Sequence, residues 1–154
     1  MNKIERFRAM LRGYPVDHVP AGFWFHFDPA FRGGPAMAQR HIDYYYQSDM
    51  DILKVMNDNG HPAVGRLAVH EPDDWATLEP APLEAEAFQA QMEGLRGIVS
   101  TLKGQVPIIT TTFNPFREAI LILMHSDRQL YPTEHAARLG LLGQLRREPE
   151  PVLR

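Results

Sequence analysis

The chain has 154 residues, 44% of them hydrophobic and 23% charged, and its 16 Lys and Arg residues against 19 Asp and Glu residues give a formal net charge of −3. This balance is typical of a folded globular protein, and the slight acidic excess offers no electrostatic attraction to nucleic acid or an anionic membrane. The lack of cysteine excludes disulfides, thiolate zinc sites, iron–sulfur clusters and cysteine nucleophiles. No apolar run approaches the roughly 18 residues of a membrane span, and the first residues lack a secretion signal, so we expect a cytoplasmic protein with neither nucleic-acid nor membrane partners.

The first third of the chain predicts a helix, a strand and a second helix. Asn2 and Glu5 have the spacing of a capping box, which favours a helix over Asn2–Leu11. The apolar and aromatic run Val19–His26 is too short for a confident helix and suits a strand buried on both faces. Ala36–Gln47 is predicted to be helical.

The remainder predicts two further strands, each followed by helix. Met50–Asn57 and the β-branched run Val106–Phe113 are the strand candidates. Leu83–Lys103 carries apolar residues three or four positions apart, the spacing of an amphipathic helix. Two more helices are expected over 114–124 and 133–147. Strands that alternate with helices favour a parallel sheet built from βαβ units.

A motif near the start of the chain resembles a known family. Arg12–Pro20 reads Arg-Gly-Tyr-Pro-Val-Asp-His-Val-Pro, which is similar to the opening of the uroporphyrinogen decarboxylase family. Three later segments keep the order of the family's motifs: Phe27–Arg32, Met50–Asp58 and Thr112–Phe116. The similarity covers nearly the whole chain but only the first half or less of a family member.

The family fold is an eight-stranded α/β barrel, so the resemblance implies an α/β protein with a partial TIM barrel. It would comprise an N-terminal helix and about the first three βα units. A complete barrel typically needs about 250 residues. We therefore expect residues 1–154 to be the truncated N-terminal portion of one barrel domain, without activity in isolation.

The resemblance also implies a chemistry and a set of site residues. Family decarboxylases use no cofactor and remove the acetate side chains of a tetrapyrrole in porphyrin biosynthesis. Asp58 matches the functional aspartate at the end of the second strand, although Asp58-Asn59-Gly60 is also ordinary turn sequence. Arg32 matches an arginine of the substrate-facing loop. His26 and Phe25 end the first strand at the same mouth, where His26 either contacts substrate, pairs with Asp58 or packs among aromatic residues.

Two departures from the family pattern leave the substrate open. Phe23–Phe27 stands where the decarboxylases carry arginines that grip substrate carboxylates, and Ala119–Ile122 lacks the family's tyrosine. Binding of an octacarboxylate is therefore expected to be weak. The alternatives are the corrinoid-dependent methyltransferase branch, whose zinc ligands lie in the second half of its barrel, or a non-catalytic module that completes a barrel with a partner chain. The seven histidines show no metal-ligand spacing, so no metal is expected here. The expected partner is a small molecule related to a tetrapyrrole or corrinoid, and a homodimer is left open.

Overall fold

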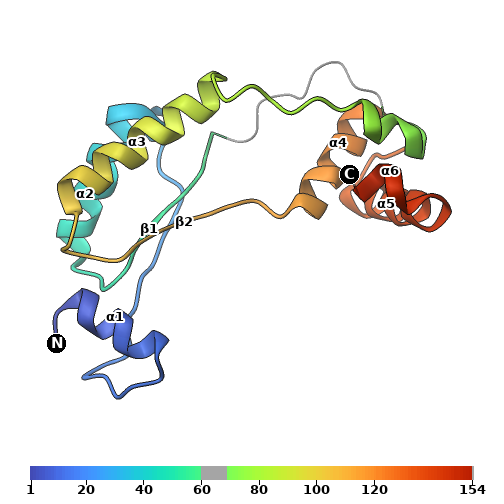
Figure 1. Ribbon diagram of the computed structural model, residues 1–154. Coiled ribbons are helices and arrows are strands. Elements are labelled where there is room, and N and C mark those ends of the chain that lie inside the picture. Colours follow the sequence, from blue (N-terminus) through green and yellow to red (C-terminus); the bar gives the residue numbers. More distant parts are fainter. Residues whose placement is uncertain (60–68, 154) are drawn as a thin grey trace. The chain divides into compact units, whose positions relative to one another are not determined.

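The computed structural model describes residues 1–59 and 69–153, which are mostly helical (Figure 1). They form two compact units. The first unit contains residues 1–59 and 82–112, and the second contains residues 69–81 and 113–153. No helix within these described ranges is long and apolar enough to cross a membrane.

The first unit holds the β-structure of the described chain. Its elements are α1 (Lys3–Leu11), the 3-10 helix η1 (Pro29–Phe31), α2 (Gly34–Ser48), β1 (Leu53–Val55), α3 (Glu86–Leu102) and β2 (Ile108–Thr110). The two strands pair in parallel, with Leu53 opposite Ile108 and Val55 opposite Thr110. Because α3 lies between them in the chain, β1, α3 and β2 form a crossover connection.

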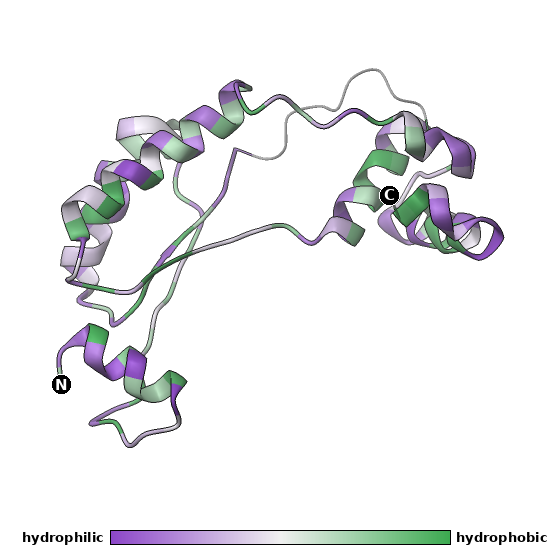
Figure 2. Ribbon diagram, in the orientation of Figure 1, coloured by the Kyte–Doolittle hydropathy of each residue, from purple (hydrophilic) through white to green (hydrophobic). Residues whose placement is uncertain are grey.

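Local sequence explains where the helices of this unit begin and end. The predicted capping box is confirmed: the Asn2 side chain accepts from the Glu5 N–H, and the Glu5 side chain accepts from the Asn2 N–H. α2 has a proline in its first turn and ends at Asp49, which adopts a left-handed conformation with φ 49°. Hydrophobic and hydrophilic residues alternate along α3 in Figure 2, as expected of an amphipathic helix.

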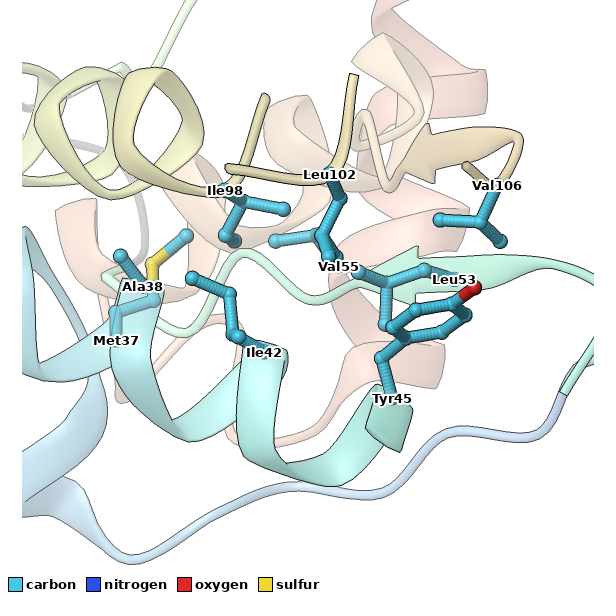
Figure 3. Packing of buried hydrophobic residues seen from close by; sticks show 9 residues of the cluster. All are labelled: Met37, Ala38, Ile42, Tyr45, Leu53, Val55, Ile98, Leu102 and Val106. Carbon is cyan, nitrogen blue, oxygen red and sulfur yellow. The ribbon is translucent and has the colours of Figure 1, made fainter. Parts of the chain in front are cut away.

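A single apolar cluster joins α2 and α3 to β1 (Figure 3). Its fully or nearly fully buried members are Met37, Ala38, Ile42, Tyr45, Leu53, Val55, Ile98, Leu102 and Val106. Leu53 and Val55 point into this cluster, so the intervening Lys54 lies on the other face of the strand. The helices therefore cover one face of the short sheet. No helix of the residues described in this unit packs on the other face, which carries Lys54 and is called the uncovered face below.

The predicted partial TIM barrel is wrong. The described residues contain a two-stranded sheet rather than three βα units, and each strand is only three residues long. The expected first strand, Val19–His26, does not form a regular strand. It still lies beside the chain that leads into β1, because the N–H groups of Asp51 and Ile52 both donate to the Ala21 carbonyl, at 3.0 and 3.3 Å. Pro20 has no N–H to donate and Gly22 has no side chain to pack, so a regular ladder does not extend along this segment.

α1 is fixed by a charged cluster at the amino end of β1. The Arg6 guanidinium binds Asp17 through Nε at 2.7 Å and Nη2 at 2.9 Å, and its Nη1 lies 2.6 Å from Asp51 Oδ1. The Asp51 carboxylate also accepts from the Ala21 N–H at 3.1 Å and lies 3.1 Å from His18 Nε2. Arg6 and Asp51 are both buried, and their charges are compensated within the cluster.

This cluster predicts acid sensitivity of the first unit. The hydrogen bond from Arg6 lowers the pKa of Asp17. Burial alone would raise the pKa of Asp51. The hydrogen bond from the Ala21 N–H and the interactions with His18 and Arg6 outweigh burial, so the pKa of Asp51 is lowered as well. Because both folded-state pKa values lie below the unfolded values, the ionised carboxylates stabilise the fold at neutral pH, and that stability is lost as the pH falls below about 5.

The measurement is the thermal midpoint of unfolding between pH 7 and pH 3. Asp51→Asn is expected to be less stable than the wild type at pH 7 and to lose less on acidification. Asp73→Asn, at an exposed position in the second unit, is the matched control and should keep the wild-type slope. An unchanged slope in Asp51→Asn would contradict the assignment.

The second unit is helical. It comprises η2 (Pro72–Thr77), α4 (Pro115–Ser126), α5 (Glu134–Arg147) and α6 (Pro149–Leu153). Its buried apolar residues are Val69, Trp75, Ile120, Leu123, Tyr131, Ala137 and Leu141. Within this cluster the Trp75 indole N–H donates to Gln144 Oε1 at 2.6 Å, and Gln144 Nε2 donates to the His70 carbonyl at 3.0 Å. The buried amide of Gln144 is thereby satisfied and ties η2 to α5.

Candidate functional site

Two side chains predicted for the site meet in the first unit. His26 ends the extended segment 19–26, and Asp58 follows β1, so both stand at the carboxyl ends of neighbouring extended segments. His26 Nδ1 lies 2.6 Å from Asp58 Oδ1. The His26 side chain is 64% exposed and that of Asp58 is 19% exposed. The pair therefore presents a solvent-facing imidazole that is backed by a more buried carboxylate.

The loop that carries Asp58 is held by amide side chains. Asn59 Nδ2 donates to the Arg32 carbonyl and to Gln91 Oε1, both at 2.9 Å. Gln91, which is buried on α3, donates in turn to the Met56 carbonyl at 3.2 Å. These bonds connect the end of β1 to both η1 and α3, so the backbone on either side of Asp58 is fixed in place.

Phe25 and Phe27, the aromatic residues on either side of His26, pack against α2. The Phe25 ring makes an edge contact with Tyr44 at a centroid distance of 5.0 Å, and the Phe27 ring makes one with His41 at 4.8 Å. His41 is buried, which lowers its pKa, and its Nδ1 donates to the Met37 carbonyl at 2.9 Å. His41 is therefore a neutral core residue that packs the aromatic segment.

The even-numbered residues lie on the opposite side of this segment. Trp24 and His26 make an edge contact at a centroid distance of 5.5 Å. Lys54 Nζ lies 4.5 Å from the centroid of the Trp24 ring. The uncovered face of the sheet thus carries a continuous row of contacts from Lys54 through Trp24 and His26 to Asp58.

The other predicted site residues take different positions. Phe25 lies against Tyr44, on the side of its segment opposite His26, and its exposed fraction is 45%. Arg32 is exposed at the end of η1, and its backbone carbonyl, rather than its guanidinium, makes the bond to Asn59. The structure therefore brings together His26 and Asp58, and leaves Phe25 and Arg32 as supports of the surrounding loop.

Sequence reasoning missed Lys54 and Trp24. The available signal was the two-residue alternation of side chains in extended chain. It places Trp24 on the same side of its segment as His26. It places Lys54 on the face of β1 that does not carry the buried Leu53 and Val55. Within the part of the chain that the structure describes, there is no group of three His, Asp or Glu side chains that could hold a metal ion. The chemistry of the row is that of an acid–base pair, an aromatic ring and an ammonium group.

Gly22 sets the spacing between the His26 segment and β1. A Cβ atom at this position would lie 2.5 Å from the Ile52 carbonyl oxygen, which is backbone and cannot move aside cheaply. Gly22→Ala is expected to cost about 1–3 kcal/mol of unfolding free energy and to speed hydrogen exchange of the Asp51 and Ile52 amides, which donate to Ala21. Denaturant unfolding and amide exchange measure these effects.

Gly143→Ala is the control for this substitution, because no heavy atom lies within 4 Å of the added Cβ. At that helical position alanine is expected to be neutral or to stabilise by up to about 1 kcal/mol. Wild-type exchange of the Asp51 and Ile52 amides in Gly22→Ala would show that the close approach does not hold the segment.

Comparisons of this chain with protein-family models, curated proteins and solved structures find no match. The relation to the uroporphyrinogen decarboxylase family therefore stays a prediction from the motifs in Arg12–Pro20 and Met50–Asp58. The geometry of the first unit, by itself, gives a histidine–carboxylate pair at the carboxyl ends of two extended segments.

Proposed function

We propose that this chain binds a small organic molecule at the His26–Asp58 pair and transfers protons to it, in a reaction of the uroporphyrinogen decarboxylase type. The expectation that it is inactive in isolation followed from a truncated barrel, which the two-stranded sheet contradicts, so we propose activity for the chain itself. The observation that carries the proposal is the 2.6 Å contact between His26 Nδ1 and Asp58 Oδ1 at the carboxyl ends of two adjacent extended segments. Substrate sites of open α/β sheets lie at this edge. The motif resemblance supplies the reaction type.

The geometry assigns a role to each nitrogen of the imidazole. A carboxylate only accepts hydrogen bonds, so the proton between the two groups belongs to His26 Nδ1. Nε2 is then the nitrogen left to exchange a proton with a bound molecule. Histidine is the side chain that proteins use most often for such proton transfer. Asp58 orients the ring and stabilises positive charge on it or on a neighbouring substrate.

A decarboxylation at this pair begins with protonation of the substrate. The protonated His26 gives a proton to a pyrrole ring carbon beside an acetate-bearing carbon, and the ring becomes cationic. The bond between the acetate methylene and its carboxylate breaks, carbon dioxide leaves, and the bonding electrons neutralise the ring. The methylene then takes up a proton and the ring carbon returns its own, so each acetate consumes one proton and becomes a methyl group.

The test is a titration of the ¹⁵N-labelled chain, followed by amide chemical shifts. The probes are uroporphyrinogen and coproporphyrinogen, kept reduced in the dark, and hydroxocobalamin as a corrinoid. A porphyrinogen is expected to shift the amides of His26 and Asp58, and the tetracarboxylate should bind at least as tightly as the octacarboxylate because few cationic groups stand at the site. Shifts produced by the corrinoid alone would favour methyl transfer over decarboxylation and overturn the proposal.

His26→Ala should lose the response to the porphyrinogen. The control is His135→Ala, at an exposed position in the first turn of α5, which should respond as the wild type does. If no probe shifts either His26 or Asp58, the proposal fails.

A further inference from the structure

The uncovered face of the sheet holds a lysine that has no carboxylate partner among the described residues. The chain has three lysines, Lys3, Lys54 and Lys103. Lys3 binds Asp49 at 2.6 Å, and Lys103 caps the end of α3. Lys54 forms no ion pair with any of the described residues, and its Nζ lies instead over the Trp24 ring, 4.5 Å from the centroid.

This position is unusual for a surface lysine, because the side chain rises from the centre of a strand and not from a loop or a helix. Lys54 is half-buried between Leu53 and Val55, both of which are buried on the opposite face. The ammonium contacts Trp24, and the Trp24 ring in turn contacts His26. Such a cation–π contact contributes little at an exposed site, so an anion can recruit the ammonium at low cost.

Trp24 adds the second element of a ligand site. Its side chain is 45% exposed, and it contacts Lys54 on one side and the His26 ring on another. An exposed indole beside an ammonium group matches a molecule that joins a flat, apolar ring to a carboxylate: the ring packs on the indole and the carboxylate takes a charge-assisted hydrogen bond. An uncharged ring would gain only the first interaction.

We infer that Lys54 and Trp24 form the recognition half of the site, and that they bind a carboxylate attached to a planar heteroaromatic ring. This inference rests on the proposed function for its location, since it places the carboxylate of the substrate at Lys54 and its ring on Trp24, which contacts His26. Lys54 takes the place of the arginines that the sequence lacks at Phe23–Phe27. A single ammonium group selects a ligand with one carboxylate near the ring, rather than one that needs many cationic contacts.

The test compares pyrrole-2-carboxylate with the uncharged pyrrole-2-carboxamide, again on the ¹⁵N-labelled chain. The readout is the indole N–H signal of Trp24. The indole N–H of Trp75 is bonded to Gln144 in the second unit and serves as an internal reference that should not move. The carboxylate is expected to shift the Trp24 signal with an apparent Kd about tenfold or more below that of the amide, the value of one charge-assisted hydrogen bond.

Lys54→Met keeps the length and apolar contact of the side chain but removes its charge, and is expected to reduce carboxylate binding to the level of the amide. Lys103→Met is the matched control and should bind as the wild type does. Equal affinities for carboxylate and amide in the wild type, or unchanged carboxylate binding by Lys54→Met, would overturn the inference.

Failure of this inference is separable from failure of the proposed function. A porphyrinogen response at His26 together with no preference for the carboxylate probe would retain the acid–base pair and remove Lys54 from the site. A carboxylate preference without any porphyrinogen response would retain Lys54 in a carboxylate site and remove the His26–Asp58 pair from the proposed function.

Discussion

Replacement of Leu102 by alanine is expected to remove about 2–5 kcal/mol from the free energy of unfolding of the first unit. Leu102 is completely buried in the cluster that joins α3 to α2 and β1. Its truncation leaves a cavity that the surrounding side chains fill only in part. Because a domain of this kind has about 5–15 kcal/mol in total, the loss should be visible as a lower denaturant midpoint and as faster amide exchange in α2, α3 and β1.

Val99→Ala is the control on the same helix. Val99 lies almost one turn before Leu102, but its side chain is 45% exposed. Loss of two exposed methyl groups is expected to change stability by no more than about 0.5 kcal/mol. Similar effects of the two substitutions would show that α3 does not pack through the face that carries Ile98 and Leu102.

The helices of this chain were predictable because their signals are local. Asn2, Asn114 and Thr133 each precede a helix and each accepts a hydrogen bond from an N–H of its first turn. The sequence predicted the cap at Asn2 and began the two later helices at the other two residues. The spacing of apolar residues in 83–103 likewise predicts α3 to within three residues at each end. A helix cap and an amphipathic pattern each lie within about a dozen consecutive residues, so predicting the helix requires no knowledge of residues far away in the chain.

The sheet could not be predicted to the same extent. Strand pairing is nonlocal, and the parallel pair β1 and β2 joins residues more than fifty positions apart, Leu53 and Ile108. The segments 50–57 and 106–113 have strand composition, but hydrogen bonds to a neighbour decide how much of each forms a ladder. The inferred barrel came from resemblance, and the structure has only a short parallel ladder in its place.

The sequence offered His26 and Asp58 as candidates one by one, but it did not fix how they are arranged. His26 and Asp58 were both identified from sequence, and their pairing was one of three options for His26. Lys54 and Trp24 were not identified, because a lysine in a strand and a tryptophan in an aromatic run have no motif. Their relation depends on two extended segments lying side by side, which in turn depends on the close approach at Gly22.

Asp58→Asn is expected to lower the rate of acetate loss by about 100-fold or more, the usual contribution of a positioned acid–base group. The substituted amide can either donate or accept a hydrogen bond, so it no longer requires the proton to reside on His26 Nδ1. The imidazole is then free to place its proton on Nε2, where it cannot accept one from a bound molecule. The amide also removes the negative charge that stabilises a cationic ring.

Two measurements check this result, and one of them does not depend on turnover. The ¹⁵N chemical shifts of the His26 ring nitrogens report which nitrogen carries the proton; in the wild type the neutral ring should be protonated on Nδ1, and in Asp58→Asn the two forms should mix. Product analysis of the porphyrinogen that binds most tightly gives the rate. Asp73→Asn, exposed in η2, should match the wild type in both. A variant that keeps the Nδ1 form would show that Asp58 does not set the orientation of His26, and a variant that keeps the full rate would remove Asp58 from the chemistry.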